Sequence, residues 1–354
     1  MGERRLGLVA TIALAVAALL GVSAGLLVLD PRTTGADALR TGGLAGGSVI
    51  ALYALWLNDR RRRVEEQRQG LENRRTELER DRVSDERFAR AIELLGHDAD
   101  QVRVGALHAL AGLARSNPAY TQTVLDVLCS YLRRSFLHPR YGDAPTKPPD
   151  EERPEVWSGG AANNAERRLQ VRLTAQRIIT DLLPAADDAA APSYDLDLTG
   201  ATLEYLNLAD RKIGTLVLRY ARLHSDNNFS RCAFLGPVWC TGAVSGAGRL
   251  SGRIRWRDAV FHDLAAFREV HFDSAVSFDR TRFGGTATFA DSTFTGRVSM
   301  AGCVFEGDAN FTAVRFAGHV DLDSAEWRGK VANADIRVSP DHDVALPESW
   351  PVSA

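Results

Sequence analysis

The sequence lacks the cysteine pairs and short catalytic motifs that mark many metal proteins and enzymes. Its four cysteines, at positions 129, 232, 240 and 303, are scattered and include no CxxC pair. This spacing disfavours a zinc site and favours buried thiols in a reducing compartment. No GxxxxGK[ST], GxGxxG or HExxH motif occurs either. We therefore expect no catalytic residue, no cofactor and no metal site, and a protein that is not an enzyme.

A large net charge is also missing. The chain of 354 residues carries 43 Lys and Arg against 45 Asp and Glu, a formal net charge of −2. That balance disfavours a strongly basic nucleic-acid-binding protein, and it disfavours a chain that imitates a polyanion over its whole length. Long apolar runs are absent after residue 58.

Two uncharged runs do occur before residue 58. The first extends from Leu6 to Leu29 and the second from Thr41 to Leu57. A secretory signal peptide is the competing interpretation of the first run. The run is longer than the apolar region of such a peptide, and it is long enough to cross a bilayer. Residues 1–58 are therefore predicted to form a two-helix transmembrane hairpin.

Arginine placement predicts the orientation of this hairpin. Arg4 and Arg5 precede the first run and four arginines at 60–63 follow the second, whereas the connecting loop has only Arg32 and Arg40. The positive-inside rule places both termini in the cytoplasm of a multi-pass cell-membrane protein with two spans, in contact with the lipid bilayer. Glycines at 42, 46, 43 and 47 have GxxxG spacing, which permits close helix packing or self-association.

The next segments are predicted to be helical. Residues 59–87 form a charged helical stem in which Val64, Leu71 and Leu78 recur every seven residues; this is half of a coiled-coil seam, so a homo-oligomer is an open alternative. Residues 88–132 form a small α-helical block whose VRxGALxALxxLA pattern resembles a HEAT repeat. A Pro- and Gly-rich flexible linker follows at 133–163, and residues 164–194 supply a helix and a lead-in that cap the next domain.

A regular repeat occupies residues 195–338 and is the most informative feature of the chain. Large apolar residues recur every five positions, and then at alternating steps of six and five. The predicted inward positions are Leu198, Leu203, Leu208, Ile213, Leu218, Leu223, Phe229, Phe234, Trp239, Phe261, Phe267, Phe272, Phe278, Phe283, Phe289, Phe294, Met300, Phe305, Phe311, Phe316, Leu322 and Trp327. From residue 259 onward a small residue lies two positions before each of them.

Period five fits neither a helix of 3.6 residues per turn nor a simple strand with a period of two. It does fit stacked coils in which each large residue and the small residue before it point inward, while the residues between them turn a corner. Coils about 4.8 Å apart can bond backbone to backbone like neighbouring strands. The pattern blurs at 224–256, where Asn228 and Ser245 occupy expected inward positions, so an irregular coil or bulge is expected there.

The motif LTGAT-LEYLN-LADRK, beginning at Leu198, resembles the pentapeptide-repeat family, whose units are typically A(D/N)LxX. The resemblance implies a right-handed quadrilateral β-helix. Together with the two apolar runs, the stem and the helical block, the sequence is similar to a membrane-anchored actinobacterial class of these proteins, for which no activity is implied. The predicted fold class is thus membrane-anchored α+β, and residues 339–354 form a C-terminal tail.

The resulting function hypothesis is a non-catalytic membrane-tethered scaffold that binds an unknown protein partner. The alternatives are a regulator of a membrane-associated signalling or defence system, an unrecognised activity in the helical block, and a topoisomerase-binding DNA mimic as in some family members. The mimic needs an acidic rod, but residues 195–338 hold 17 acidic and 17 basic residues, so we expect no nucleic-acid role. The candidate interaction face is the basic cluster Arg249, Arg253, Arg255 and Arg257.

Overall fold

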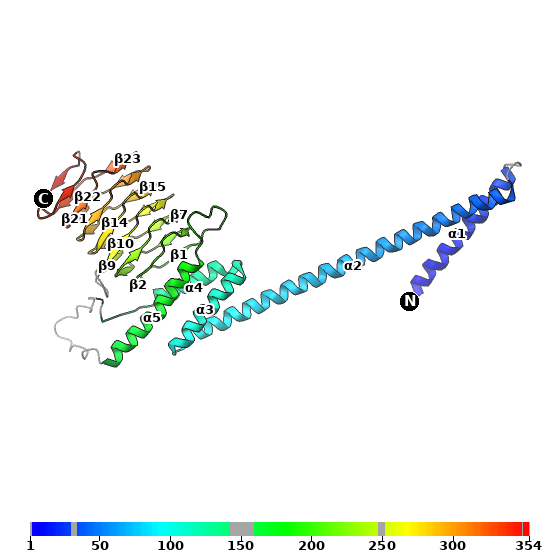
Figure 1. Cartoon of the computed structure of the whole chain (residues 1–354), viewed down its shortest axis with the longest axis horizontal. Coiled ribbons are helices and arrows are strands. Elements are labelled where there is room, and N and C mark those ends of the chain that lie inside the picture. The colour runs from blue at the N-terminus through cyan, green and yellow to red at the C-terminus, as the bar shows by residue number, and fades with distance from the viewer. Residues whose placement is uncertain are drawn as a thin grey trace. The chain divides into compact units, whose positions relative to one another are not determined.

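The computed structural model describes residues 2–29, 34–139, 141, 159–246, 252–348 and 350–353. It divides into two compact units, Met1–Ser84 and Asp85–Ala354. Figure 1 shows the element order within the described residues, in which long helices are followed by a stack of short strands.

The first unit contains helix α1 (Gly2–Leu29) and most of helix α2 (Gly35–Leu95). Within the described residues, the segment Gly35–Asp59 is long and apolar enough to cross a membrane, and Ala10–Gly25 is a shorter apolar helix. One segment is therefore a candidate membrane helix. The predicted second span is not confirmed by this finding and stays a prediction.

One of the two predicted GxxxG spacings is used between α1 and α2. A Cβ atom added at Gly46 would lie 3.0 Å from the Ala15 carbonyl oxygen, and one added at Gly42 would overlap Ser23. Gly43 and Gly47 meet nothing within 4 Å. The Gly42/Gly46 spacing thus lets the two helices pack closely within one chain, as small residues do between membrane helices.

The stem is the middle part of α2, which passes residue 59 without a break. Leu71 and Leu78 are 65% and 70% exposed, so this part of the helix is solvated in a single chain. The helix ends at Leu95, and the Gly96 N–H closes the last turn on the Ile92 and Glu93 carbonyls.

The helical block of the second unit combines the end of α2 with α3 (Asp100–Ser116), a 3₁₀ turn η1 (Pro118–Tyr120), α4 (Thr121–Arg133) and α5 (Gly159–Leu182). Asn117 caps the turn by accepting a hydrogen bond from the Ala119 N–H, as its position before a proline predicts. Apolar faces such as Leu107, Leu110 and Leu128 are fully buried and join the core of the strand domain.

The strand domain is a right-handed β-solenoid of about seven turns, which confirms the solenoid part of the predicted fold class. Its strands form four parallel sheets, one for each face. Sheet B contains β1 (Leu196–Asp197), β4 (Leu216–Val217), β8 (Val238–Trp239), β12 (Ala265–Ala266), β16 (Ala287–Thr288), β20 (Ala309–Asn310) and β24 (Val331–Ala332). Sheet C contains β2 (Thr202–Glu204), β5 (Arg222–His224), β9 (Val244–Gly246), β13 (His271–Phe272), β17 (Thr293–Phe294), β21 (Arg315–Phe316), β25 (Ile336–Val338) and β27 (Val352–Ser353).

The other two faces follow the same pattern. Sheet D contains β6 (Asn227–Asn228), β10 (Arg253–Arg255), β14 (Ala275–Ser277), β18 (Val298–Ser299), β22 (Val320–Asp321) and β26 (Val344–Ala345). Sheet E contains β3 (Lys212–Ile213), β7 (Ala233–Phe234), β11 (Val260–Phe261), β15 (Arg282–Phe283), β19 (Val304–Phe305) and β23 (Glu326–Trp327). From β4 to β26 the chain visits the faces in the order B, C, D and E, with one strand on each face per coil. The first coil meets sheet D only through the single bridge between Asn207 and Asn228.

Strand register measures the length of each coil. Leu203 pairs with Leu223, so an early coil advances the chain by four units of five. Phe272 pairs with Phe294, and this longer step matches two units of five and two of six. Asn227 pairs with Ile254, so the coil between them is longer than a regular coil by about one further unit. The irregular coil expected at 224–256 is thus one longer coil, and regular pairing resumes at β10.

The predicted inward positions hold from Leu198 to Leu322 with two corrections. Trp239 is only half-buried and points away from the core, because Val238 and Cys240 take the inward positions. Leu218 corresponds to Cys240 in the sheet register, so the step from Phe234 to the next inward residue is six rather than five. Asn228 likewise lies outside and Asn227 is buried, whereas Ser245 is inward as expected.

Both ends of the solenoid are covered. At the N-terminal end, the Gln122 side chain on α4 donates to the Asp195 carbonyl and accepts from the Asp195 N–H, both at 2.9 Å. At the other end, β26 and β27 continue sheets D and C beyond residue 338. Trp350 is 8% exposed and contacts the Phe311 and Trp327 rings. The segment predicted as a tail thus contributes strands and an apolar cap.

Candidate interaction surface

Among the described residues no group of three or more His, Cys, Asp or Glu side chains could hold a metal ion. All four cysteines are buried and free, and burial raises the pKa of the Cys129, Cys232 and Cys303 thiols to about 12. A thiol with so high a pKa is a poor nucleophile at neutral pH.

One open groove of about 550 Å³ lies between α5 and the first coils. Its lining includes Gln176, Arg177, Asp181, Tyr205 and Arg211. Gln176 donates to the Glu204 carbonyl oxygen at 2.8 Å and Arg211 donates to that of Leu183 at 3.3 Å, so these side chains also join the helix to the solenoid. No nucleophile with an adjacent base lines the groove.

A buried polar cluster fixes the segment after α4 on sheet C. The Tyr141 hydroxyl donates to the Glu204 carboxylate at 2.9 Å, and its ring stacks on His224 with centroids 3.9 Å apart. The Ser225 hydroxyl donates to the same carboxylate at 2.9 Å. Phe136 and Tyr141 are buried, so this part of the predicted linker 133–163 is packed against the first coils. Residues 140 and 142–158 lie outside the described residues.

Charged residues of opposite sign alternate along the corner between sheets D and E. Asp210, Arg231, Asp258 and Arg280 occupy equivalent corner positions, and all four have φ between 56° and 62°. Arg231 forms a two-pronged ion pair with Asp210 at 2.5 and 2.8 Å, and Arg280 forms one with Asp258 at 2.6 and 2.8 Å. These arginine hydrogen bonds hold the pKa of Asp210 and of Asp258 below the ordinary range.

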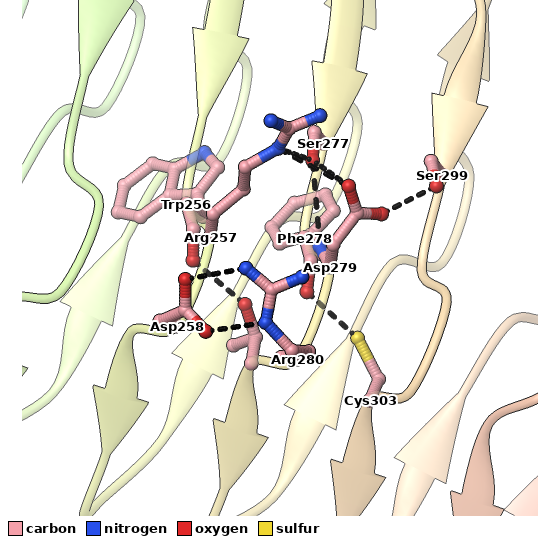
Figure 2. A network of polar contacts seen from close by, with 10 residues as sticks. Trp256, Arg257, Asp258, Ser277, Phe278, Asp279, Arg280, Ser299 and Cys303 are labelled. Carbon is pink, nitrogen blue, oxygen red and sulfur yellow. Dashed lines mark hydrogen bonds and ion pairs between the residues drawn. The ribbon is translucent and has the colours of Figure 1, made fainter.

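A second set of polar contacts lies beside this corner (Figure 2). The Arg257 Nε donates to the Ser277 hydroxyl at 2.8 Å and lies 3.1 Å from the Asp279 carboxylate. Asp279 also accepts hydrogen bonds from the Ser277 and Ser299 hydroxyls. Behind the surface, the Cys303 thiol donates to the Phe278 carbonyl. Hydrogen bonds at and behind this surface thus join neighbouring coils.

The basic cluster predicted from the sequence is partly neutralised by the carboxylates of Asp226 and Asp279. Arg253 and Arg255 flank the buried Ile254 on β10 and lie 3.6 and 3.2 Å from the Asp226 carboxylate. Arg257 lies on the adjacent turn, next to Asp279. These three arginines therefore share one side of the solenoid, with two acidic groups among them. Arg249 lies outside the described residues.

A different surface is not predicted from the sequence, because the spacing of the repeat assigns Trp239 to the core. The structure places this indole on the outer side of sheet B, where the Arg219 guanidinium lies 4.5 Å from its ring centroid. Tyr220 follows Arg219 in the sequence and is 63% exposed. The signal that could have revealed this surface is the Val238 and Cys240 pair, which fits the inward alternation as well as Trp239 does.

Comparison with known proteins agrees with this architecture. A family model described as pentapeptide repeats (9 copies) matches residues 257–304. No curated protein and no solved structure matches the chain. The fold and surface define a protein of the β-solenoid class with a helical block at its N-terminal end. The solenoid is therefore built from pentapeptide repeats, as the LTGAT-LEYLN-LADRK motif predicts.

Proposed function

We propose that this protein is a non-catalytic scaffold, tethered to the cell membrane, that presents its solenoid in the cytoplasm to a partner protein. The observation that carries the proposal is the filled core: Phe267 and Phe289 stack on each other, Phe278 packs edge-on against both, and all three are fully buried. A solid rod with short strands offers surfaces rather than a deep substrate pocket. Pentapeptide-repeat proteins are in general structural or interaction proteins, which agrees with this function.

The tether is supported by the apolar segment Gly35–Asp59 and by the close packing of Gly42 and Gly46 on α1. The arginines at 60–63 and the sparse charge of the preceding loop favour a cytoplasmic solenoid. Charge balance argues against a DNA mimic, since the corner pairs Asp210–Arg231 and Asp258–Arg280 neutralise each other.

The basic cluster supplies a first test of the scaffold. Full-length wild type and a variant with Arg253, Arg255 and Arg257 changed to Ala are recovered from membranes under the same conditions, and co-purifying proteins are compared. Arg282→Ala, an exposed arginine on sheet E that pairs with Glu306, serves as the matched control. Loss of one stoichiometric partner in the triple variant alone would support this face. A partner retained by all three proteins would reject the face and leave the scaffold proposal standing, whereas no partner with any of them would contradict the scaffold.

A further inference from the structure

Most large aromatic residues of the solenoid lie in its core, and Trp239 and Tyr220 are exceptions. Trp239 ends β8 on the outer side of sheet B, between Val217 of β4 and Ala266 of β12 in the strand register. Tyr220 occupies the corner after β4 and is 63% exposed. Tryptophan, tyrosine and arginine are the residue types most enriched at the energetic centres of protein interfaces.

Arg219 is stacked on this aromatic surface. Its guanidinium carbon lies 4.5 Å from the Trp239 ring centroid, within the range of a cation–π contact. A guanidinium stacked on a ring keeps its in-plane N–H donors available for a carboxylate, and stacking removes part of the entropy that a free arginine would lose on binding. We call the set Trp239, Arg219 and Tyr220 the sheet B patch.

The backbone holds Tyr220 in place. Tyr220 has a φ of 56°, which is uncommon for a residue with a side chain, and Gly242 in the next coil has a φ of 68°. A Cβ atom at Gly242 would lie 2.5 Å from the Tyr220 ring, so the ring rests directly on this glycine. The Tyr220 ring is therefore held by two adjacent corners, so it needs little ordering before a partner binds.

Its charge is less neutralised than that of the predicted basic cluster. Within the described residues no acidic side chain lies within ion-pair distance of Arg219, whereas the neighbouring Asp197 already pairs with Arg133. Farther along the same face, Arg268 lies 3.7 Å from Asp291. The pKa of the Asp197 carboxyl is lowered against the effect of burial, chiefly by hydrogen bonds from Thr199 and then by the charges of Arg133 and Arg219. A cationic, aromatic surface favours an anionic ligand with an apolar neighbour.

We propose that the sheet B patch binds an acidic peptide segment of a partner protein. A carboxylate of the segment pairs with Arg219, and an adjacent apolar side chain packs on Trp239 and Tyr220. The inference rests on the proposed scaffold function and adds to it the location and chemistry of one binding surface. A lipid surface is the less favoured occupant, since stable electrostatic attachment takes a cluster of about four to eight basic residues.

The test selects peptides against the purified full-length chain from a displayed library of random sequences. Enriched peptides are synthesised with a fluorescent label, and their affinity is measured by polarisation. The proposal predicts peptides in which Asp or Glu adjoins an apolar residue. It also predicts that Arg219→Ala and Trp239→Ala each weaken binding about tenfold or more, since a charge-assisted hydrogen bond and an aromatic anchor are removed. Arg268→Ala is the matched control and should change affinity by less than about threefold.

Unchanged circular dichroism and melting of both variants show that the surface alone was altered. Enrichment of basic or neutral peptides, wild-type affinity in the Arg219→Ala and Trp239→Ala proteins, or the absence of any enriched peptide would overturn the proposal. Displacement of the peptide by phosphatidylglycerol vesicles in wild type, but not in these variants, would assign the patch to lipid instead. Peptides that bind another face would reject this patch while leaving the scaffold function intact, and the membrane pull-down tests that function separately.

Discussion

Single phenylalanine side chains fill the solenoid, and Phe289 illustrates how. Its ring stacks on Phe267 at 5.2 Å and on Phe311 at 4.8 Å, and it is fully buried. Phe289→Ala should lower the free energy of unfolding by about 3–5 kcal/mol because it leaves a cavity. Phe289→Asp should prevent folding of the solenoid, because it buries an unpaired charge. Circular dichroism and thermal melting measure both; a Phe289→Asp protein that melts like wild type would show that this position does not point inward.

Glycines at the corner between sheets C and D let successive coils approach. A Cβ atom at Gly318 would lie 2.6 Å from the carbonyl oxygens of Gly296 and Thr295. Gly318→Ala should therefore lower the free energy of unfolding by about 1–3 kcal/mol through overpacking. The control is Gly112→Ala in α3, where nothing lies within 4 Å, and helix propensity predicts a gain of about 0.5–1 kcal/mol. Denaturant unfolding of both variants checks the sign, and equal shifts would contradict the close approach.

Small buried residues just before the sheet E strands donate hydrogen bonds to backbone carbonyls of the core, and Cys303 does so with its thiol. Cys303 donates to the Phe278 carbonyl and Thr281 donates to that of Trp256. Burial raises the pKa of Cys303 to about 12 from an ordinary value of 9.0. The folded chain therefore keeps this proton up to about pH 12, while the unfolded chain loses it above about pH 9. Stability should fall as pH rises between those values.

Cys303→Ser retains the hydrogen bond and removes the titration. The denaturant midpoint should fall less between about pH 8 and pH 10 in this variant than in wild type, because serine does not ionise in that range. The variant also corrects for tyrosine and lysine groups, which titrate in both proteins. An identical pH dependence in the two proteins would contradict the burial of a protonated thiol at this position.

At the scale of elements, the coil that leads to β10 is longer than the coil that follows it, yet β10 pairs in parallel with its sheet D neighbour on each side. Deleting residues 247–251 joins Gly246 to Gly252 and restores the regular coil length. We expect the deletion variant to fold with a melting temperature within a few degrees of wild type. The matched deletion of residues 297–301 removes β18 and should abolish cooperative unfolding, since the sheet D strands on either side lose their partner. If the two deletions melt alike, the assigned coil boundaries are wrong.

The sequence predicts most of the solenoid because its inward side chains repeat at a fixed step. Phe261, Phe283 and Phe305 stack in register as that step requires. The prediction is wrong at Trp239 because a large apolar side chain at the expected spacing was favoured over Cys240, a smaller residue that fits the inward position. The surface that Trp239 forms with Arg219 follows only from assigning Val238 and Cys240 to the inward positions, since it depends on which face of one strand points outward.

Contacts between distant segments could not be predicted from the repeat either. Tyr141 and Glu204 are far apart in the sequence and meet only because the segment after α4 crosses the first coils. Trp350 lies in a segment without the five-residue pattern, and it covers the last coil from outside the repeat. Both contacts come from the packing of non-repeating chain on the ends and faces of the solenoid, which a periodic pattern does not encode.

At the scale of the whole molecule, the proposed membrane tether predicts a topology that reporter fusions can test. Reporter domains fused after residue 58, or at the C-terminus, should report the cytoplasm, because the arginines at 60–63 disfavour translocation. A reporter in the loop near residue 35 should report the outside. Changing Arg60, Arg61, Arg62 and Arg63 to Asn should reduce the cytoplasmic signal. An external signal from the fusion after residue 58 in the wild-type sequence would overturn the two-span topology.

The scaffold function is tested most directly by photo-cross-linking in intact cells. A photoreactive amino acid is placed at one outward position on each face of the full-length chain: Thr288 on sheet B, Thr293 on sheet C, Ser299 on sheet D and Val304 on sheet E. The account predicts that at least one face yields a discrete cross-linked protein, and that this product is recovered with the membranes. Four faces without any cross-linked product, or a full-length chain recovered entirely in the soluble fraction, would contradict it.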